Sequence, residues 1–169
     1  SFVANPGKGL SWFRDTGYAQ LIEEIAKTEG FKPIAVIFNL GVNDLGNAGN
    51  YVSYMTSIAS TLKSKNCKLF YMSVNPINST MITKSGRGAR TEAQVREFNS
   101  KIRSGLSLDY KYIDMYSVLM KKGYGTNASY NGTDADSDDG LHYTTKTFKR
   151  IYYYCITYLN TGSINASYY

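Results

Sequence analysis

Two continuous apolar runs are the clearest hydrophobic segments of the chain. They cover residues 34–40, just before a glycine, and residues 67–74, just before an Asn-Pro pair. Runs of this length without alternation of apolar and polar positions are typical of strands buried on both faces. Two shorter segments, Tyr110–Asp114 and Phe2–Ala4, have a similar character. The pattern therefore predicts four strands.

Helical periodicity fills most of the chain outside these strands. Apolar side chains recur every three or four positions over roughly 17–28, 50–65, 91–104 and 144–159. The third of these segments opens with Thr-Glu-Ala-Gln, which resembles a capping box. Alternating strands and helices predict an α/β fold of three layers, α/β/α, around a central, mostly parallel sheet. Because no internal repeat or boundary is visible in the 169 residues, we expect residues 1–169 to form a single domain.

Composition removes several classes of protein from consideration. Hydrophobic residues make up 43% of the chain and charged residues 19%, which argues against a disordered or fibrous protein. The net charge is +6, but Lys and Arg are scattered, so we do not expect a nucleic-acid partner. A modest basic cluster runs from Lys84 to Arg96 and includes Arg87 and Arg90. We interpret it as a solvated loop and helix face.

Cysteines, apolar runs and sequons bear on the cellular setting. Cys67 and Cys155 lie inside apolar segments, which favours buried free thiols over a disulfide. The chain has no run of 18 apolar residues and no signal-peptide pattern, so we expect a soluble chain without a membrane span. We interpret the Asn-x-Ser/Thr sequons as chance occurrences. They begin at Asn78, Asn127, Asn131 and Asn165.

Polar side chains follow the two long predicted strands, where a parallel sheet gathers reactive groups. Asn43 comes after the first strand, and Asn75, a candidate for substrate binding, comes after the second. The single histidine, His142, precedes the last helix and stands three residues after Asp139. Asp139 can accept the Nδ1 proton of His142 and leave Nε2 facing outward as a base. Asp138 is an alternative partner for the same ring.

Asn43 has two interpretations. A side-chain amide at the end of a rigid strand can donate a hydrogen bond to a developing oxyanion. Alternatively, Asn43 shapes the turn after Gly41 or caps the next helix. The presence of an Asp-His pair in the same chain favours the first interpretation. One histidine and no thiolate cluster make a weak ligand set, so we expect no metal ion and no other cofactor.

These two motifs resemble a known family. Gly41-Val-Asn-Asp44 is similar to the third block of the SGNH (GDSL-type) hydrolases, and Asp139-Gly-Leu-His142 is similar to their fifth. The order of the blocks and the strand, helix and strand between them also fit. The resemblance implies a flavodoxin-like SGNH hydrolase fold in which His142 activates a serine and Asp139 orients His142.

The segment from Phe2 to Gly9 resembles the second block of the family, whose glycine N–H joins the oxyanion hole. The resemblance implies that Gly9 fills this role together with Asn43, with Gly7 as the second choice. A plain glycine-rich turn is the alternative. Trp12, just beyond this segment, is a candidate for substrate binding as a pocket wall, or else part of the core.

The first block of the family, a Gly-Asp-Ser that carries the nucleophile, does not occur in these 169 residues. Ser1 precedes the segment that resembles the second strand, and Ser11, Ser73 or Ser137 would have to reach a site that the fold assigns elsewhere. We therefore expect a missing N-terminal segment that holds the first strand and the serine. A pseudo-enzyme is the alternative.

The resemblance implies a serine esterase that acts on small acyl esters, above all acetyl groups on carbohydrates, through an acyl-enzyme. The expected partner is thus a small acyl ester or an acylated carbohydrate. Two alternatives stay open. One is a non-catalytic domain that binds a glycan or a partner through Trp12 and the abundant tyrosines, and the other is an O-acyltransferase. The expected substrates and the Tyr-, Ser- and Asn-rich composition predict an extracellular or cell-surface location.

Overall fold

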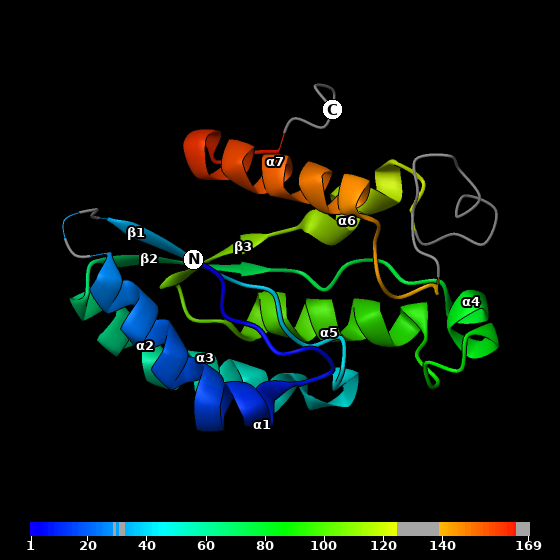
Figure 1. The fold of residues 1–169 in the computed structure, drawn as a ribbon, viewed down its shortest axis with the longest axis horizontal. Helices are drawn as coiled ribbons and strands as arrows, with labels where there is room; N and C mark the ends of the chain where they lie inside the picture. Colours follow the sequence, from blue (N-terminus) through cyan, green and yellow to red (C-terminus); the bar gives the residue numbers. More distant parts are fainter. Residues whose placement is uncertain (29, 31–32, 125–138, 165–169) are drawn as a thin grey trace. The chain divides into compact units, whose positions relative to one another are not determined.

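A parallel three-stranded sheet organises the chain. The computed structural model describes residues 1–28, 30, 33–124 and 139–164. The strands are β1 (Ile34–Phe38), β2 (Cys67–Met72) and β3 (Tyr110–Ile113), in the spatial order β1-β2-β3 (Figure 1). β1 and β2 run parallel, with Ile34 opposite Cys67 and Phe38 opposite Tyr71. Three of the four predicted strands and the α/β class are thereby confirmed.

The fourth predicted strand, Phe2–Ala4, is wrong. Residues 1–5 have no regular secondary structure, and Phe2 is 89% exposed. A strand needs a neighbour that satisfies its backbone N–H and C=O groups. None of the three strands in the described residues pairs with this segment.

The four predicted helices are confirmed, with small shifts at their ends. They are α2 (Tyr18–Lys27), α3 (Ala48–Ser64), α5 (Glu92–Gly105) and α7 (Thr145–Thr161). Helix α2 is preceded by the short α1 (Leu10–Trp12) and a π-helical turn, η1 (Phe13–Gly17), and α3 by a 3₁₀ turn, η2 (Leu45–Asn47). Two further short helices were not predicted, α4 (Ser79–Lys84) and α6 (Met115–Lys121).

Side-chain caps explain where several helices begin. The predicted capping box at the start of α5 is present, since Thr91 N–H donates to Gln94 Oε1 (2.9 Å) and Gln94 N–H donates to Thr91 Oγ1 (3.2 Å). The side chains of Asn78 and Asp114 cap α4 and α6 in a simpler way, by accepting from backbone N–H groups of the first turn.

The chain divides into two compact units. The first comprises Ser1–Met72 and Phe98–Tyr112, and the second comprises Ser73–Glu97 and Ile113–Tyr169. Since the division by itself does not test whether residues 1–169 are one domain, the single domain stays a prediction.

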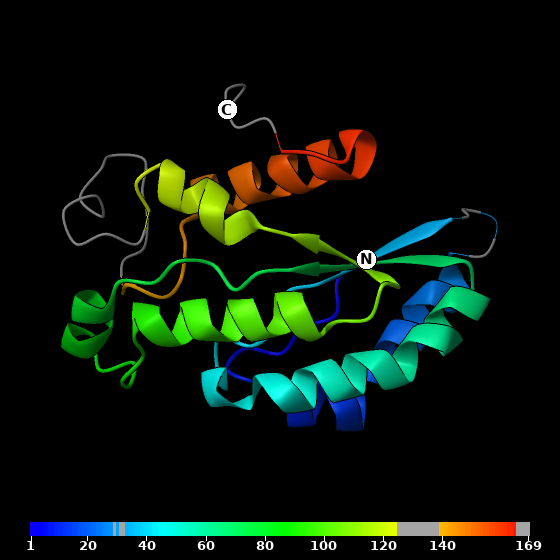
Figure 2. The same ribbon diagram turned by 180° about the vertical axis from the view of Figure 1, so that it is seen from behind.

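Aromatic packing holds the first unit together. The ring of Phe13 meets those of Tyr18, Phe38 and Tyr54 edge to face, with centroids 5.7 to 6.4 Å apart. These contacts join η1 and α2 to β1 and α3, and Figure 2 shows the two helices side by side below the strands. Edge-to-face pairs add stability beyond the area that they bury.

The second unit has its own apolar core. Its largest fully buried side chains come from the segment after β2, from α4, from β3 and from α6 and α7, and they are Ile77, Ile82, Ile113, Met115, Leu119 and Tyr154. Both cysteines, Cys67 in the first unit and Cys155 in the second, are buried free thiols, as predicted. Within the described parts of the chain, no helix is long and apolar enough to cross a membrane.

Candidate active site

The turn after β1 is shaped by a glycine that no other residue could replace without strain. Gly41 has a φ of +121°, and a Cβ at this position would overlap the ring of Phe98. Gly41 therefore sets the direction in which the backbone leaves β1. This direction determines the backbone positions of Asn43 and Asp44.

Asn43 contacts the glycine-rich segment near the N-terminus. Its Nδ2 donates to the carbonyl oxygen of Lys8 (2.9 Å). That carbonyl belongs to the peptide bond that also contains the N–H of Gly9. Asn43 therefore lies next to the Lys8–Gly9 peptide bond, but its amide contacts the carbonyl side, and in a trans peptide the N–H of Gly9 points the opposite way.

Asp44 anchors the start of α1, a role that the sequence did not reveal. Its carboxylate accepts from Leu10 N–H (3.0 Å) and from the hydroxyl of Tyr51 (2.5 Å). Burial, together with the hydrogen bond to Asp44 and its charge, raises the pKa of Tyr51 well above its usual range. Tyr51 therefore keeps its proton and remains a donor to this carboxylate.

Gly9 is confined by the same carboxylate. Its backbone is extended (φ −125°, ψ −151°), and a Cβ built on it would lie only 2.7 Å from Cγ of Asp44. Gly7, the second choice, has a φ of +73° and no atom within 4 Å of a Cβ at its position. The close approach of another chain segment therefore distinguishes Gly9 from Gly7.

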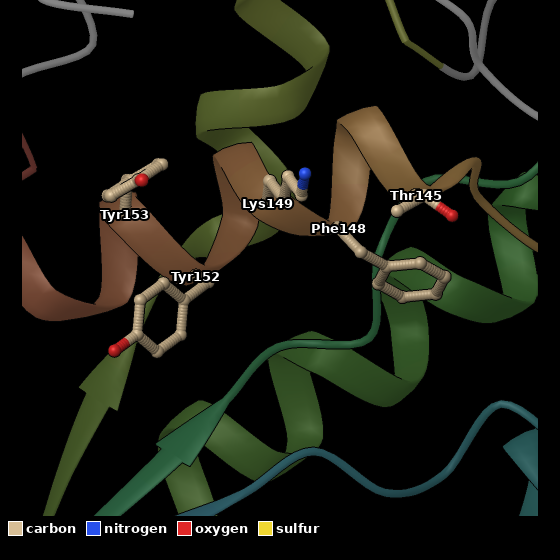
Figure 3. A pocket seen from close by; sticks show the side chains of 5 residues that line it. All are labelled: Thr145, Phe148, Lys149, Tyr152 and Tyr153. Atoms are coloured by element: carbon tan, nitrogen blue, oxygen red, sulfur yellow. The ribbon is translucent and has the colours of Figure 1, made fainter.

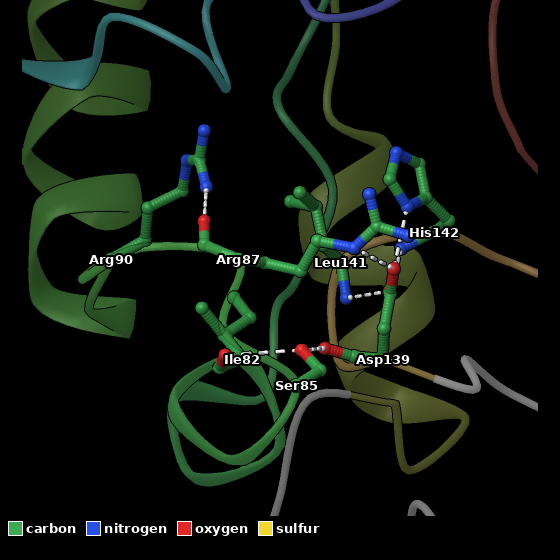
Figure 4. A network of polar contacts seen from close by, with 7 residues as sticks. All are labelled: Ile82, Ser85, Arg87, Arg90, Asp139, Leu141 and His142. Atoms are coloured by element: carbon green, nitrogen blue, oxygen red, sulfur yellow. Dashed lines mark hydrogen bonds and ion pairs between the residues drawn. The ribbon is translucent and has the colours of Figure 1, made fainter.

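The predicted pair of Asp139 and His142 is present in the second unit (Figure 4). Nδ1 of His142 lies 2.8 Å from Oδ2 of Asp139, while Oδ1 accepts from the N–H groups of Leu141 and His142, both at 2.9 Å. The carboxylate is only 13% exposed, whereas the imidazole is 63% exposed. Asp139 therefore holds the ring by one nitrogen and leaves Nε2 outward, and no residue in the described ranges hydrogen-bonds to Nε2.

The environment of Asp139 keeps its carboxyl ionised. Burial tends to raise its pKa, but hydrogen bonds from the backbone and ring of His142 and from Leu141 N–H outweigh burial and hold the pKa well below its usual range. An ionised carboxylate accepts the Nδ1 proton and stabilises an imidazolium. The pair can therefore act as a general base, because the carboxylate binds Nδ1 and Nε2 is left to accept a proton.

A second segment, residues 78–87, holds the turn that carries this pair. Asn78 N–H donates to Gly140 O (2.8 Å), and Ser85 Oγ donates to Asp139 O (3.1 Å). Nε of Arg87 lies 3.0 Å from Oδ2 of Asp139. The sequence predicted that Arg87 belongs to a solvated loop and helix face. Its side chain is indeed half-exposed, but its guanidinium also forms an ion pair with Asp139. No sequence signal identified Arg87 or Ser85, since their partner lies far along the chain.

Gly140 has to be glycine because of this segment. Its φ is +80°, and a Cβ would lie 2.5 Å from Asn78 O and 2.8 Å from Ile82 N. Both of these neighbours are backbone atoms and cannot rotate away. The glycine of Asp139-Gly-Leu-His142 thus permits the close packing of the turn against the start of α4.

The structure places the remaining candidates as follows. Asn75 is half-buried, and its buried Oδ1 accepts no hydrogen bond from the residues that the structure describes. Trp12 packs along its own helical segment, with its ring 3.0 Å from a Cβ built on Gly17. These surroundings of Asn75 and Trp12 do not test whether either residue binds a substrate. Asp138 lies outside the described residues, so it cannot be compared with Asp139.

The serines considered as nucleophiles differ in their surroundings. Ser73 is fully buried, its N–H donates to Ile113 O (3.0 Å) and its Oγ accepts from Tyr116 N–H (2.7 Å), so it joins segments of the second unit. Ser11 is exposed on α1 in the first unit. Ser137 lies outside the described residues.

A shallow surface pocket lies on α7 (Figure 3). It is lined by Thr145, Phe148, Lys149, Tyr152 and Tyr153. The two tyrosine rings meet edge to face with centroids 5.8 Å apart. Phe148, Tyr152 and Tyr153 are 52%, 61% and 48% exposed, so aromatic faces remain available at this surface.

Comparison with known proteins covers both units. A family model described as GDSL-like Lipase/Acylhydrolase matches residues 3–154, which include every candidate site residue. Searches of curated proteins and of solved structures found no match. Among the described residues, no group of three or more His, Cys, Asp and Glu side chains could hold a metal ion. The family match confirms the resemblance that the two motifs indicated.

Proposed function

Because this chain belongs to the family of GDSL-like lipases and acylhydrolases, we propose that it is a serine esterase for small acyl esters. As substrates we propose acetyl esters, above all those on carbohydrates. The observation that supports the proposal best is the contact between Asp139 and His142, because it leaves an exposed imidazole nitrogen next to an ionised, hydrogen-bonded carboxylate.

The reaction follows from this pair in two displacements. Nε2 of His142 takes the proton of a serine hydroxyl as the serine oxygen bonds to the ester carbonyl carbon. The protonated ring then donates that proton to the leaving alcohol, and an acyl-enzyme forms. In the second step, His142 deprotonates water as the water oxygen bonds to the acyl carbon. The imidazolium then returns this proton to the serine oxygen as the bond between the serine and the acyl group breaks and the acid leaves. Asp139 stays ionised and compensates the charge of the imidazolium in both steps.

Asn43 and Gly9 are the donors that we propose for the oxyanion. The family match supports the pairing, because it spans Gly9, Asn43, Asp139 and His142. The amide of Asn43 donates to Lys8 O, so it has to leave this carbonyl before both donors can face one oxygen. A preorganised amide donor is worth about a hundred- to a thousandfold in kcat. The nucleophile that we propose is a serine outside these 169 residues, since Gly-Asp-Ser is absent from them and Ser73 is enclosed by structural contacts.

Turnover of p-nitrophenyl acetate by the full encoded protein tests the proposal. We expect His142→Gln to abolish turnover nearly completely and Asn43→Ala to lower kcat by about a hundredfold or more. Asn50→Ala is the matched control, because Asn50 is also an exposed asparagine of the first unit. Equal activity of all four proteins would refute the assignment. Labelling with a fluorophosphonate, followed by peptide mass spectrometry, identifies the serine.

The exposed aromatic surface of α7 favours a second candidate function, the binding of a glycan without catalysis. Tyr152 and Tyr153 present rings of the kind that stack on sugars. This candidate predicts saturable binding of an oligosaccharide that Tyr152→Ala weakens, in a full-length protein that a fluorophosphonate does not label. An O-acyltransferase is distinguished by its products, because an added alcohol acceptor is then acylated in preference to water.

A further inference from the structure

We propose that Arg87 is a positioning residue that orients the carboxylate of Asp139 and, through it, the imidazole of His142. This inference adds a third member to the pair of Asp139 and His142, and it rests on the proposed function only for its effect on turnover. The effect on the imidazole itself is a property of the folded chain.

The contacts around Asp139 support this assignment. Its Oδ2 lies 2.8 Å from Nδ1 of His142 and 3.0 Å from Nε of Arg87, so one carboxylate oxygen serves both groups. Its Oδ1 is already occupied by the N–H groups of Leu141 and His142. Arg87 therefore holds the second carboxylate oxygen. Asn78 and Ser85, from the same segment, hold the backbone of the turn by donating to the carbonyl oxygens of Gly140 and Asp139.

The charge of Arg87 has a defined effect on the base. A cation that shares Oδ2 with the imidazole repels the imidazolium and also withdraws the negative charge that would stabilise it. Both effects disfavour the protonated ring compared with a variant that lacks this cation. The guanidinium is 54% exposed and the imidazole 63% exposed, so solvent weakens the effect without removing it.

Among the residues that the structure describes, the charged and titratable groups of Arg90, Lys84 and Tyr143 make no contact that replaces the one of Arg87. The guanidinium of Arg90 turns away and donates to the carbonyl oxygen of Arg87 (2.6 Å). Lys84 is exposed at the end of α4. Tyr143 is buried, and its hydroxyl donates to the Pro76 carbonyl oxygen, so it adds no charge. Within the described ranges, Arg87 thus contacts Asp139 directly, whereas Lys84 carries the same charge and forms no ion pair with Asp139.

His142 is the only histidine of these 169 residues, and a comparison with His142→Gln assigns its signal in an NMR titration of the full encoded protein. We expect the midpoint of this titration to lie at higher pH in Arg87→Gln than in the wild type. Arg87→Lys keeps the charge and should stay close to the wild-type value. Lys84→Gln, which removes an exposed cation of the same segment (residues 78–87), is the matched control and should leave the titration unchanged.

Kinetics of the full encoded protein supply the second readout. If the esterase is confirmed, the acidic limb of kcat/KM should move to higher pH in Arg87→Gln, so that activity about one unit below the wild-type midpoint falls about three- to tenfold. An unshifted titration in Arg87→Gln overturns the inference, as does a shift that Lys84→Gln reproduces. Because the titration needs no substrate, a failed esterase assay with a shifted pKa refutes only the proposed function.

Discussion

Gly140→Ala tests how tightly the turn of Asp139 and His142 is packed. Two costs add at this position. An alanine at a φ of +80° costs about 1–2 kcal/mol of backbone strain. The new Cβ would also lie 2.5 Å from Asn78 O and 2.8 Å from Ile82 N, and overpacking of this kind costs about 1–3 kcal/mol. We therefore expect the free energy of unfolding to fall by about 2–5 kcal/mol.

Gly86→Ala is the matched control for this experiment. Gly86 has a φ of +70°, close to that of Gly140, but no atom lies within 4 Å of a Cβ at its position. Urea unfolding followed by circular dichroism should therefore show a loss of only about 1–2 kcal/mol for Gly86→Ala. The difference between the two variants isolates the overlap with the start of α4. Equal losses in the two variants would show that the turn can move away from Asn78 at no cost, and the account of the packing would then be wrong.

Two further predictions concern partly buried carboxylates. Asp44→Asn should lower the free energy of unfolding by about 1–3 kcal/mol, because the carboxylate accepts hydrogen bonds from a backbone N–H and a phenol; Asp15→Asn, which breaks only an exposed ion pair, should change it by less than about 1 kcal/mol in the same urea assay. The lowered pKa of Asp139 stabilises the folded state above about pH 4 and this stability is lost as the pH falls towards the folded-state pKa. Urea unfolding at pH 6 and pH 3 should therefore show a smaller acid-induced loss for Asp139→Asn than for the wild type, and equal losses would contradict this prediction.

Local patterns were sufficient to predict much of the fold. The two long apolar runs became β1 and β2, and the Thr91 and Gln94 side chains cap α5 as predicted. These features depend on residues close together in the sequence. Helices α4 and α6 were missed because six or seven residues are too few to show a helical period, although the capping residues Asn78 and Asp114 gave a signal.

The candidate site could be predicted only in part. Asp139 and His142 are three residues apart, so a turn is enough to bring them together. The contact of Asn43 with Lys8 and the ion pair of Arg87 with Asp139 join segments that are distant along the chain. Such contacts depend on the tertiary fold, and in a single sequence Arg87 looks like any solvated arginine.

The close approach of Gly9 and Asp44 makes the two positions depend on each other in evolution. The carboxylate of Asp44 is held by Leu10 and Tyr51, so it cannot withdraw to make room for a side chain at position 9. Either single change therefore destabilises the fold, because a side chain at position 9 overlaps the carboxylate and a smaller residue at position 44 loses the hydrogen bonds from Leu10 and Tyr51. Sequences of related chains should vary at these two positions together.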